Sequence, residues 1–450
     1  MLWGAATAAY QIEGAAREGG RGPSIWDDFC RTPGAILNGE TGDVACDHYH
    51  RWPEDLDLAA WMGLDAYRLG VSWSRLQPAG VGPLNPEAVD FYRALLGGCH
   101  ERGIRPVVTL YHWDLPSALE ARGGWPDRDT AMHFAEYARL TATALGDLVD
   151  DWVTVNEPWC SSFLGYHDGV HAPGRRDLRA AVRAAHHLNL AHGLALREMR
   201  EVVPGASIGI STLVTDVHPA SDDPADKAAA ERVDANANQM FLAPVYTGEY
   251  TAAVHDLYGD RGLHDVIAPG DLDLIAAPTD VAGVNHYHCH VVTADPTDDH
   301  LGAVIRDAEP TPTSLGWSYR PDSLRAVLGR VAAISGLPLH VTENGAAFDD
   351  RPAEDGTVRD DARVDYLAGY TGAVLDAIED GIDVRGYFAW SLLDNFEWGE
   401  GYSQRFGLVY VDFPTQRRIP KSSANWYRDH IARHRRTVSQ TGEIQGEPRS

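Results

Sequence analysis

The sequence has few cysteines and no long apolar run, and each shortage excludes a class of protein. Five cysteines are scattered over 450 residues without a CxxC pair, which excludes a disulfide framework or a zinc ribbon and favours a reducing, cytoplasmic compartment. No run of about 18 apolar residues offers a membrane span, and the first residues lack the basic-then-apolar order of a signal peptide. A natural start upstream of Met1 stays open, because residues 2–4 already look like a strand.

Positive charge is also scarce. Arginine and lysine together number 38 against 65 acidic residues, for a formal net charge of −27, and Lys227 and Lys421 are the only lysines. Such a surface repels nucleic acids and anionic membranes, so neither is expected as a partner. A neutral small molecule is compatible with it, and the sequence does not indicate an oligomeric state.

Short apolar, β-branched runs alternate with helical stretches, which is the pattern of βα units around a parallel sheet. Helix boundaries are readable between them: Asn85 precedes Pro86 and Glu87, a capping residue before a first-turn proline and acid. The sequence predicts an α/β fold, a single (β/α)₈ TIM barrel over residues 1–432 with long loops on its catalytic face. The runs are 2–10, 66–72, 106–111, 152–156, 207–214, 281–287, 337–343 and 384–392.

Other segments are expected to be irregular. Residues 290–336 and 346–363 are predicted to be long loops after the sixth and seventh strands. Residues 433–450 have no apolar period and are expected to form a disordered C-terminal tail.

Two glutamates end apolar runs in polar clusters. Residues 153–158 read VTVNEP and contain Glu157, and residues 340–345 read HVTENG and contain Glu343. On strands four and seven of a barrel, both carboxyl groups would project at the carboxyl ends of the strands, where barrel enzymes keep their chemistry.

These motifs resemble those of family 1 glycoside hydrolases, and the likeness runs from Trp3–Gly14 (WGAATAAYQIEG) to about Trp426. The resemblance implies a retaining β-glycosidase, most simply a β-glucosidase, with Glu343 as nucleophile and Glu157 as acid and then base. A retaining mechanism needs two carboxyl groups about 5 Å apart, and at that distance their repulsion raises one pKa, so Glu157 is expected to be protonated in the free enzyme. Arg68 matches a family arginine that pairs with the nucleophile, although the usual Arg-Phe-Ser wording is absent.

The resemblance also implies a sugar pocket with aromatic platforms and hydroxyl-binding groups. Trp390 and Trp317 match the platforms under the sugar and the leaving group, and Tyr287 matches a hydrogen-bond partner of the nucleophile. The residues implied to bind or support the substrate are Gln11, His112, Trp113, Asn156, Asn285, Tyr287, Trp317, Trp390, Glu397 and Trp398. Glu397 would repel a 6-phosphate, and Gln404 and Phe406 stand where a phosphate-binding lysine and tyrosine would be needed, so an unphosphorylated β-glycoside or oligosaccharide is expected.

Alternating histidines at His286, His288 and His290 suggest a metal site as a competing interpretation. Because Asn285 and Tyr287 by resemblance face the pocket, the histidines are expected to point outward, and no metal or cofactor is expected. Three alternatives stay open: a transglycosylating β-glycosidase, a noncatalytic sugar-binding barrel and a metal-dependent barrel hydrolase.

Overall fold

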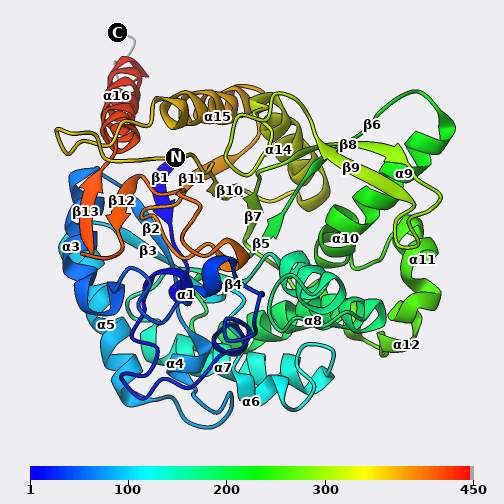
Figure 1. Cartoon of the computed structure of the whole chain (residues 1–450). Coiled ribbons are helices and arrows are strands. Elements are labelled where there is room, and N and C mark those ends of the chain that lie inside the picture. The colour runs from blue at the N-terminus through cyan, green and yellow to red at the C-terminus, as the bar shows by residue number, and fades with distance from the viewer. Residues whose placement is uncertain (446–450) are drawn as a thin grey trace.

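A computed structural model describes residues 1–445, in which eight parallel strands close into a barrel (Figure 1). The strands neighbour one another in the order β1, β2, β3, β4, β5, β7, β10, β11 and back to β1. All eight predicted runs become barrel strands, which confirms the (β/α)₈ prediction. The strands are β1 (Leu2–Ala6), β2 (Ala66–Gly70), β3 (Arg105–Tyr111), β4 (Asp151–Asn156), β5 (Ser207–Leu213), β7 (Val281–Asn285), β10 (Leu339–Asn344) and β11 (Val384–Trp390).

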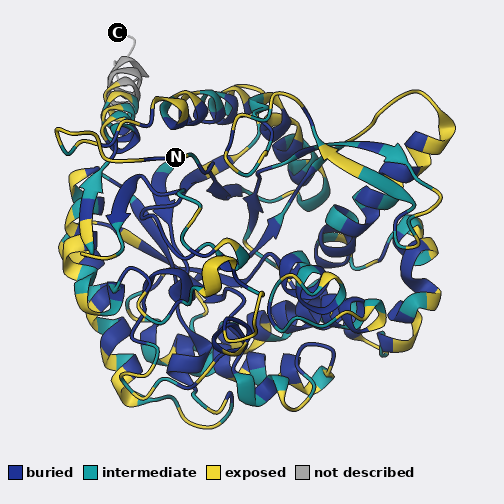
Figure 2. Ribbon diagram, viewed as in Figure 1, coloured by how far each residue is buried: buried dark blue, intermediate teal, exposed yellow. Residues whose placement is uncertain are grey.

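Helices surround the barrel and bury its outer face. Figure 2 shows the central strands buried and the exposed residues gathered on the outer sides of the helices. A parallel sheet covered in this way is buried on both faces, which is why its strands are continuous apolar runs. The outer helices are α3 (His48–Trp61), α5 (Pro86–Glu101), α7 (Arg128–Leu145), α8 (Leu178–Val202), α10 (Met240–Thr247), α14 (Pro321–Ser335), α15 (Asp361–Glu379) and α16 (Ser422–Gln445).

Local signals set several of these boundaries. The Asn85 side chain accepts a hydrogen bond from the Glu87 amide at 3.2 Å and Pro86 is the first residue of α5, as its sequence predicts. Short helices fill the connections: α1 (Ala9–Ile12), α2 (Ile25–Phe29), α4 (Trp73–Leu76), α6 (Ser117–Glu120), α9 (Pro224–Asp234), α11 (Ala252–Tyr258), α12 (His264–Val266) and α13 (Asp271–Ile275). Further short 3₁₀ and π helices are η1 (Leu37–Gly39), η2 (Cys160–Asp168), η3 (Ala235–Gln239), η4 (Gly259–Leu263) and η5 (Trp398–Glu400). Among residues 1–445, no helix has both the length and the apolar character needed to cross a bilayer.

The segment predicted as a loop over 290–336 is instead largely regular. It contains β8 (Cys289–Ala294), β9 (Ala303–Asp307) and α14, and β8 pairs with β6 (Asp216–Pro219) and β9 in a small three-stranded sheet beside the barrel (Figure 1). A second small sheet joins β12 (Val409–Asp412) to β13 (Arg417–Pro420). Their strands are half-exposed and short, so they lack the apolar runs that identify the barrel strands.

The expected C-terminal tail also differs from the structure, because helix α16 continues through residues 433–445. The rings of His430 and His434, one turn apart, stand edge-on to Trp3 at 4.7 and 5.3 Å, and Arg435 bonds Asp65. These long-range contacts favour a helix whose own sequence has no apolar period. Residues 446–450 of the predicted tail lie outside the described residues.

Candidate active site

Glu157 and Glu343 stand at the carboxyl ends of two barrel strands, as their motifs predict. Glu157 directly follows β4 and Glu343 is the fifth residue of β10. Both side chains are buried, with 4% and 3% of the residue surface exposed. The charge of Glu343 is one cause of the raised pKa of Glu157.

The two oxygens of Glu343 accept strong hydrogen bonds from different donors. Arg68 Nη1, from β2, lies 2.5 Å from Oε1, and the Tyr287 hydroxyl donates to Oε2 at 2.8 Å. Arg68 is fully buried, and its Nη1 also reaches the Thr342 carbonyl oxygen at 3.1 Å. Glu343 thus has a permanent cation and a phenol beside it.

Glu157 has neutral neighbours instead. Asn285 Nδ2 donates to its Oε1 at 2.8 Å and the Cys160 thiol donates to its Oε2 at 3.3 Å. Burial and the Glu343 charge raise the pKa of Glu157 well above its ordinary value, and these two donors oppose the rise. The environments of the two carboxyl groups therefore differ in the way that separates an acid from an anion.

A layer of hydrogen-bonded guanidinium, amide and hydroxyl groups connects the two carboxyl groups on the side away from the cavity. Arg68 Nη2 donates to Asn156 Oδ1 at 2.7 Å, and Asn285 Nδ2 donates to the same oxygen at 3.0 Å. Thr342 donates to Asn285 Oδ1 at 2.6 Å. The layer takes one residue each from β2, β4, β7 and β10, so it exists only once the barrel is closed.

Above this layer lies a cavity of about 320 Å³, which is within the usual size of a small-ligand site. Its wall is mainly aromatic. Nine residues predicted for the site line it: His112, Trp113, Glu157, Tyr287, Trp317, Glu343, Trp390, Glu397 and Trp398. Arg68, Asn156 and Asn285 lie in the layer below, and Gln11 reaches the site through Glu397.

Two predicted hydroxyl-binding residues have free polar atoms and one does not. Gln11 Oε1 and His112 Nδ1 are buried without a hydrogen-bond partner among the described residues. A ligand hydroxyl would satisfy such atoms. The indole N–H of Trp113, in contrast, already donates to the Asn156 carbonyl oxygen at 3.0 Å.

Glu397 is the third acid of the cavity. Gln11 Nε2 donates to its Oε2 at 3.3 Å, and burial together with the charges of Glu343 and Glu157 raises the pKa of Glu397 to about 8. A further anion placed beside these three carboxyl groups would add to this repulsion.

The backbone is strained at three places on the cavity wall. Trp113, Glu157 and Trp398 have φ of 78°, 45° and 50°, in the left-handed region that bulky residues rarely adopt. Strain of this kind collects at functional sites, where the surrounding structure holds it in place.

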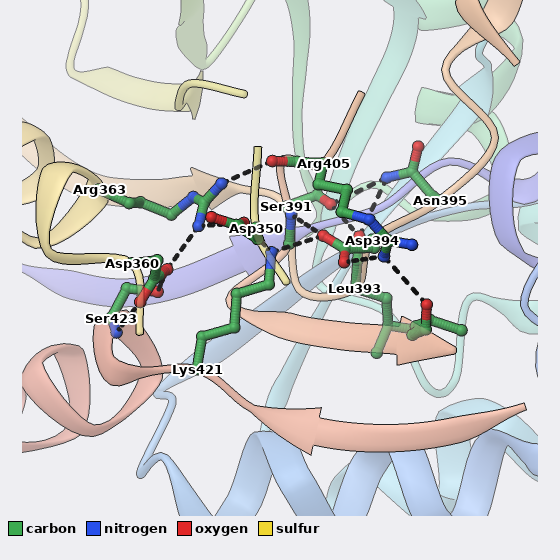
Figure 3. Close-up of polar contacts among 12 residues, drawn as sticks. Asp350, Asp360, Arg363, Ser391, Leu393, Asp394, Asn395, Arg405, Lys421 and Ser423 are labelled. Atoms are coloured by element: carbon green, nitrogen blue, oxygen red, sulfur yellow. Dashed lines mark hydrogen bonds and ion pairs between the residues drawn. The ribbon is translucent and has the colours of Figure 1, made fainter. Parts of the chain in front are cut away.

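A buried ionic network holds the segment that carries Trp390, Glu397 and Trp398 (Figure 3). Lys421 Nζ contacts Asp394 at 2.7 Å and Asp350 at 2.5 Å, and both carboxylates are buried. Arg363 joins the network through Asp350 and Asp360, and Arg405 pairs with Asp394. Asn395, the residue after Asp394, accepts a hydrogen bond from Gln11. Gln11 also donates to Glu397, so it connects the network to the cavity wall.

Sequence reasoning missed several wall residues. Trp159, Cys160, His171 and His288 also line the cavity. Trp159 and Cys160 could have been predicted, because they directly follow the Asn156-Glu157-Pro158 motif. His171 and His288 become wall residues only through folding.

The expectation that the histidines after β7 point outward is correct for His286 and wrong for His288. His286 contacts Ser323 of α14 at 2.7 Å and the Val214 carbonyl oxygen at 2.8 Å. His288 instead lines the cavity and stands edge-on to Trp317 at 4.6 Å. The strand alternation that the expectation assumed ends at Asn285, where β7 stops.

Fold and site together define a class, namely α/β-barrel hydrolases that hold a carboxyl pair in an aromatic-walled pocket. The profile of glycosyl hydrolase family 1 matches residues 1–436. A β-glucosidase of Agrobacterium sp. is 45% identical over 95% of this chain and 93% of its own length, and thermostable β-glucosidase B of Thermobispora bispora is 48% identical over 96% and 90%. The solved family 1 β-glucosidase of Thermotoga maritima superposes with a TM-score of 0.93 at 43% identity, covering 96% of this chain and 97% of that one. The chain belongs to glycosyl hydrolase family 1.

Proposed function

We propose that this enzyme is a retaining β-glucosidase that releases terminal, non-reducing, unphosphorylated β-D-glucosyl residues. The observation that carries the proposal is the unequal setting of the two carboxyl groups. Glu343 has Arg68 and Tyr287 on its two oxygens, whereas Glu157 is buried among neutral donors and its pKa is raised. A nucleophilic carboxylate and a protonated acid need these two settings.

The reaction proceeds in two displacements. Glu343 attacks the anomeric carbon while Glu157 protonates the departing glycosidic oxygen, leaving the sugar esterified to Glu343. Esterification removes the Glu343 charge, which is one of the causes of the raised pKa of Glu157. Glu157, which has already given its proton to the leaving group, therefore stays ionised and acts as the base that accepts a proton from the water that hydrolyses the ester.

The roles of the surrounding residues follow from their places. Trp390 and Trp317 supply faces for the sugar and the leaving group, and Gln11, His112, Glu397 and Trp398 meet the hydroxyls. Asn156 lies next to Glu157 in the polar layer and suits a sugar hydroxyl near the reacting carbon. A hydrogen bond there that strengthens in the transition state lowers the barrier. Arg68 and Asn285 support the two carboxyl groups without lining the cavity.

Azide rescue of Glu343→Ala tests the assignment. The variant should lose at least about 10⁴-fold in kcat on p-nitrophenyl β-glucoside. Azide should enter the space of the missing carboxylate and restore turnover as the α-glucosyl azide, which is the inverted product. Glu354→Ala, at an exposed glutamate outside the cavity wall, is the matched control and should keep its activity. An active Glu343→Ala enzyme, or a β-configured azide product, would contradict the assignment.

Preference for an unphosphorylated sugar is tested by comparing kcat/KM for p-nitrophenyl β-glucoside and its 6-phosphate. We expect at least about a hundredfold preference for the plain glucoside, because a further anion would raise the pKa of Glu397 still more and no lysine or arginine of the described cavity wall would pair with the phosphate. Comparable rates on the two substrates would refute this part of the proposal.

A further inference from the structure

His288, His290 and Asp307 form a compact group at the mouth of the cavity, which we name the rim cluster. It lies on the small sheet beside the barrel: His288 directly precedes β8, His290 is on β8, and Asp307 is the last residue of β9. His290 and Asp307 are direct partners in the antiparallel pairing of these strands. The backbone therefore fixes which side chains meet.

The three side chains offer ligand atoms at coordination distances. One ligand atom from each lies within 4.8 Å of the others. His288 Nδ1 is 3.2 Å from Asp307 Oδ1, and His290 Nε2 is 4.0 Å from the same oxygen. Two ligands held tetrahedrally on one ion at about 2.1 Å are roughly 3.4 Å apart, so small side-chain movements suffice to bring all three onto one ion.

His290 is poorly satisfied by the protein. Its Nδ1 is buried without a hydrogen-bond partner among the described residues, and its Nε2 is too far from Asp307 for a hydrogen bond. The strand therefore holds His290 with Nε2 toward the Asp307 carboxylate and without a hydrogen bond between the two, which leaves this nitrogen available to a cation.

The environment around the ligands also fits an ion. Asp307 Oδ1 accepts a hydrogen bond from Ser318 at 3.4 Å, which gives one ligand outer support. The three side chains keep 16–20% of their surface exposed, so an ion has an entry path and room for water ligands.

We propose that the rim cluster binds one divalent transition-metal ion, such as Zn²⁺ or Ni²⁺, at the mouth of the pocket. Two imidazoles and one carboxylate favour these ions over Mg²⁺ and Ca²⁺, which prefer oxygen ligands alone. Coordination through His288 Nδ1 requires the tautomer that carries its proton on Nε2.

The site is separate from the carboxyl pair and acts at the leaving-group end of the pocket. His288 lines the cavity and touches the ring of Trp317. An ion on the cluster would fix His288 and place positive charge near that ring. We therefore expect it to change the KM of aryl β-glucosides more than kcat. This consequence rests on the proposed function, whereas the binding itself does not.

Calorimetric titration of the metal-stripped, full-length chain with Zn²⁺ and then Ni²⁺ tests the binding. We expect one saturable ion per chain and at least a tenfold loss of affinity in both His290→Gln and Asp307→Asn. The control is His218→Gln. His218 belongs to the neighbouring group of Asp216, His218 and Cys289, its side chain is more than half exposed, and it already contacts Asp216 at 2.9 Å. The control should bind like the parent chain, and circular dichroism should show all variants folded.

Three results would overturn the proposal: no saturable binding below about 1 mM, equal affinity in His290→Gln and the parent, or loss of binding only in the control. Because the titration contains no substrate, an inactive chain would refute the proposed glucosidase and leave the metal result intact. With active enzyme, Zn²⁺ should raise the KM of p-nitrophenyl β-glucoside at least twofold, and His290→Gln should abolish the rise. An unchanged KM at saturating Zn²⁺ would overturn the coupling to the pocket.

Discussion

Replacing Cys160 with alanine should move the alkaline limb of the pH profile to higher pH. Burial and the nearby Glu157 carboxyl raise the pKa of the Cys160 thiol well above its ordinary value, so it stays protonated and donates to Glu157 Oε2 at 3.3 Å. This donation favours the charged form of Glu157 and lowers its pKa. Removing the donor raises that pKa.

The size of the shift follows from the strength of the bond. A neutral hydrogen bond contributes about 0.5–1.5 kcal/mol net, and a thiol is a weak donor, so we take about 0.5 kcal/mol. At about 1.4 kcal/mol per pKa unit, this corresponds to a rise of about 0.4 units in Glu157. As the acid, Glu157 works while protonated, so activity is lost as pH rises through its pKa, and a higher pKa extends activity upward.

The assay is kcat/KM for p-nitrophenyl β-glucoside across pH, which reports the groups of the free enzyme. The alkaline limb of Cys160→Ala should move up by about 0.4 units while the acid limb stays. Cys99→Ala is the matched control, because Cys99 is a fully buried cysteine on α5, outside the cavity wall. Both variants should lose a similar stability of about 1 kcal/mol.

Three outcomes would refute this reasoning. An alkaline limb that stays in place would mean that the thiol does not lower the pKa of Glu157. A limb that moves to lower pH would mean that water replaces the thiol as a better donor. An equal shift in Cys99→Ala would assign the effect to general loosening of the fold.

Two further predictions follow from the network and the rim. Lys421→Met leaves Asp350 and Asp394 without their shared cation and should lower the free energy of unfolding in urea by about 3–5 kcal/mol. Lys227→Met is the control: the exposed side chain of Lys227 pairs with Asp222, and its loss should change the free energy of unfolding by less than about 0.5 kcal/mol. Equal losses in the two lysine variants would contradict the network's role. Trp317→Ala should raise KM about fivefold for p-nitrophenyl β-glucoside and little for methyl β-glucoside, because about 1 kcal/mol of aromatic contact is lost only with the aryl group. Equal changes for both substrates would remove Trp317 from the leaving-group side.

The barrel strands were predictable because each is buried on both faces. Residues 66–70 and 105–111 are apolar or small over most of their length, and such runs between capped helices are a local signal. The positions of Glu157 and Glu343 were predictable for the same reason, since both follow directly from where a strand ends. The small strands β8 and β9 were missed because their partly exposed residues break the pattern.

The sequence by itself determined the (β/α)₈ barrel, the two glutamates at its carboxyl rim and the aromatic character of the pocket, because these depend on local patterning and on motifs. Only the tertiary structure decided which groups surround each glutamate: Arg68 reaches Glu343 across 275 positions, and Asn285 reaches Glu157 across 128. It also turned His288 into the pocket and extended α16 over Trp3. Contacts of this kind depend on closure of the barrel, which brings distant strands together, and no local spacing encodes their distances.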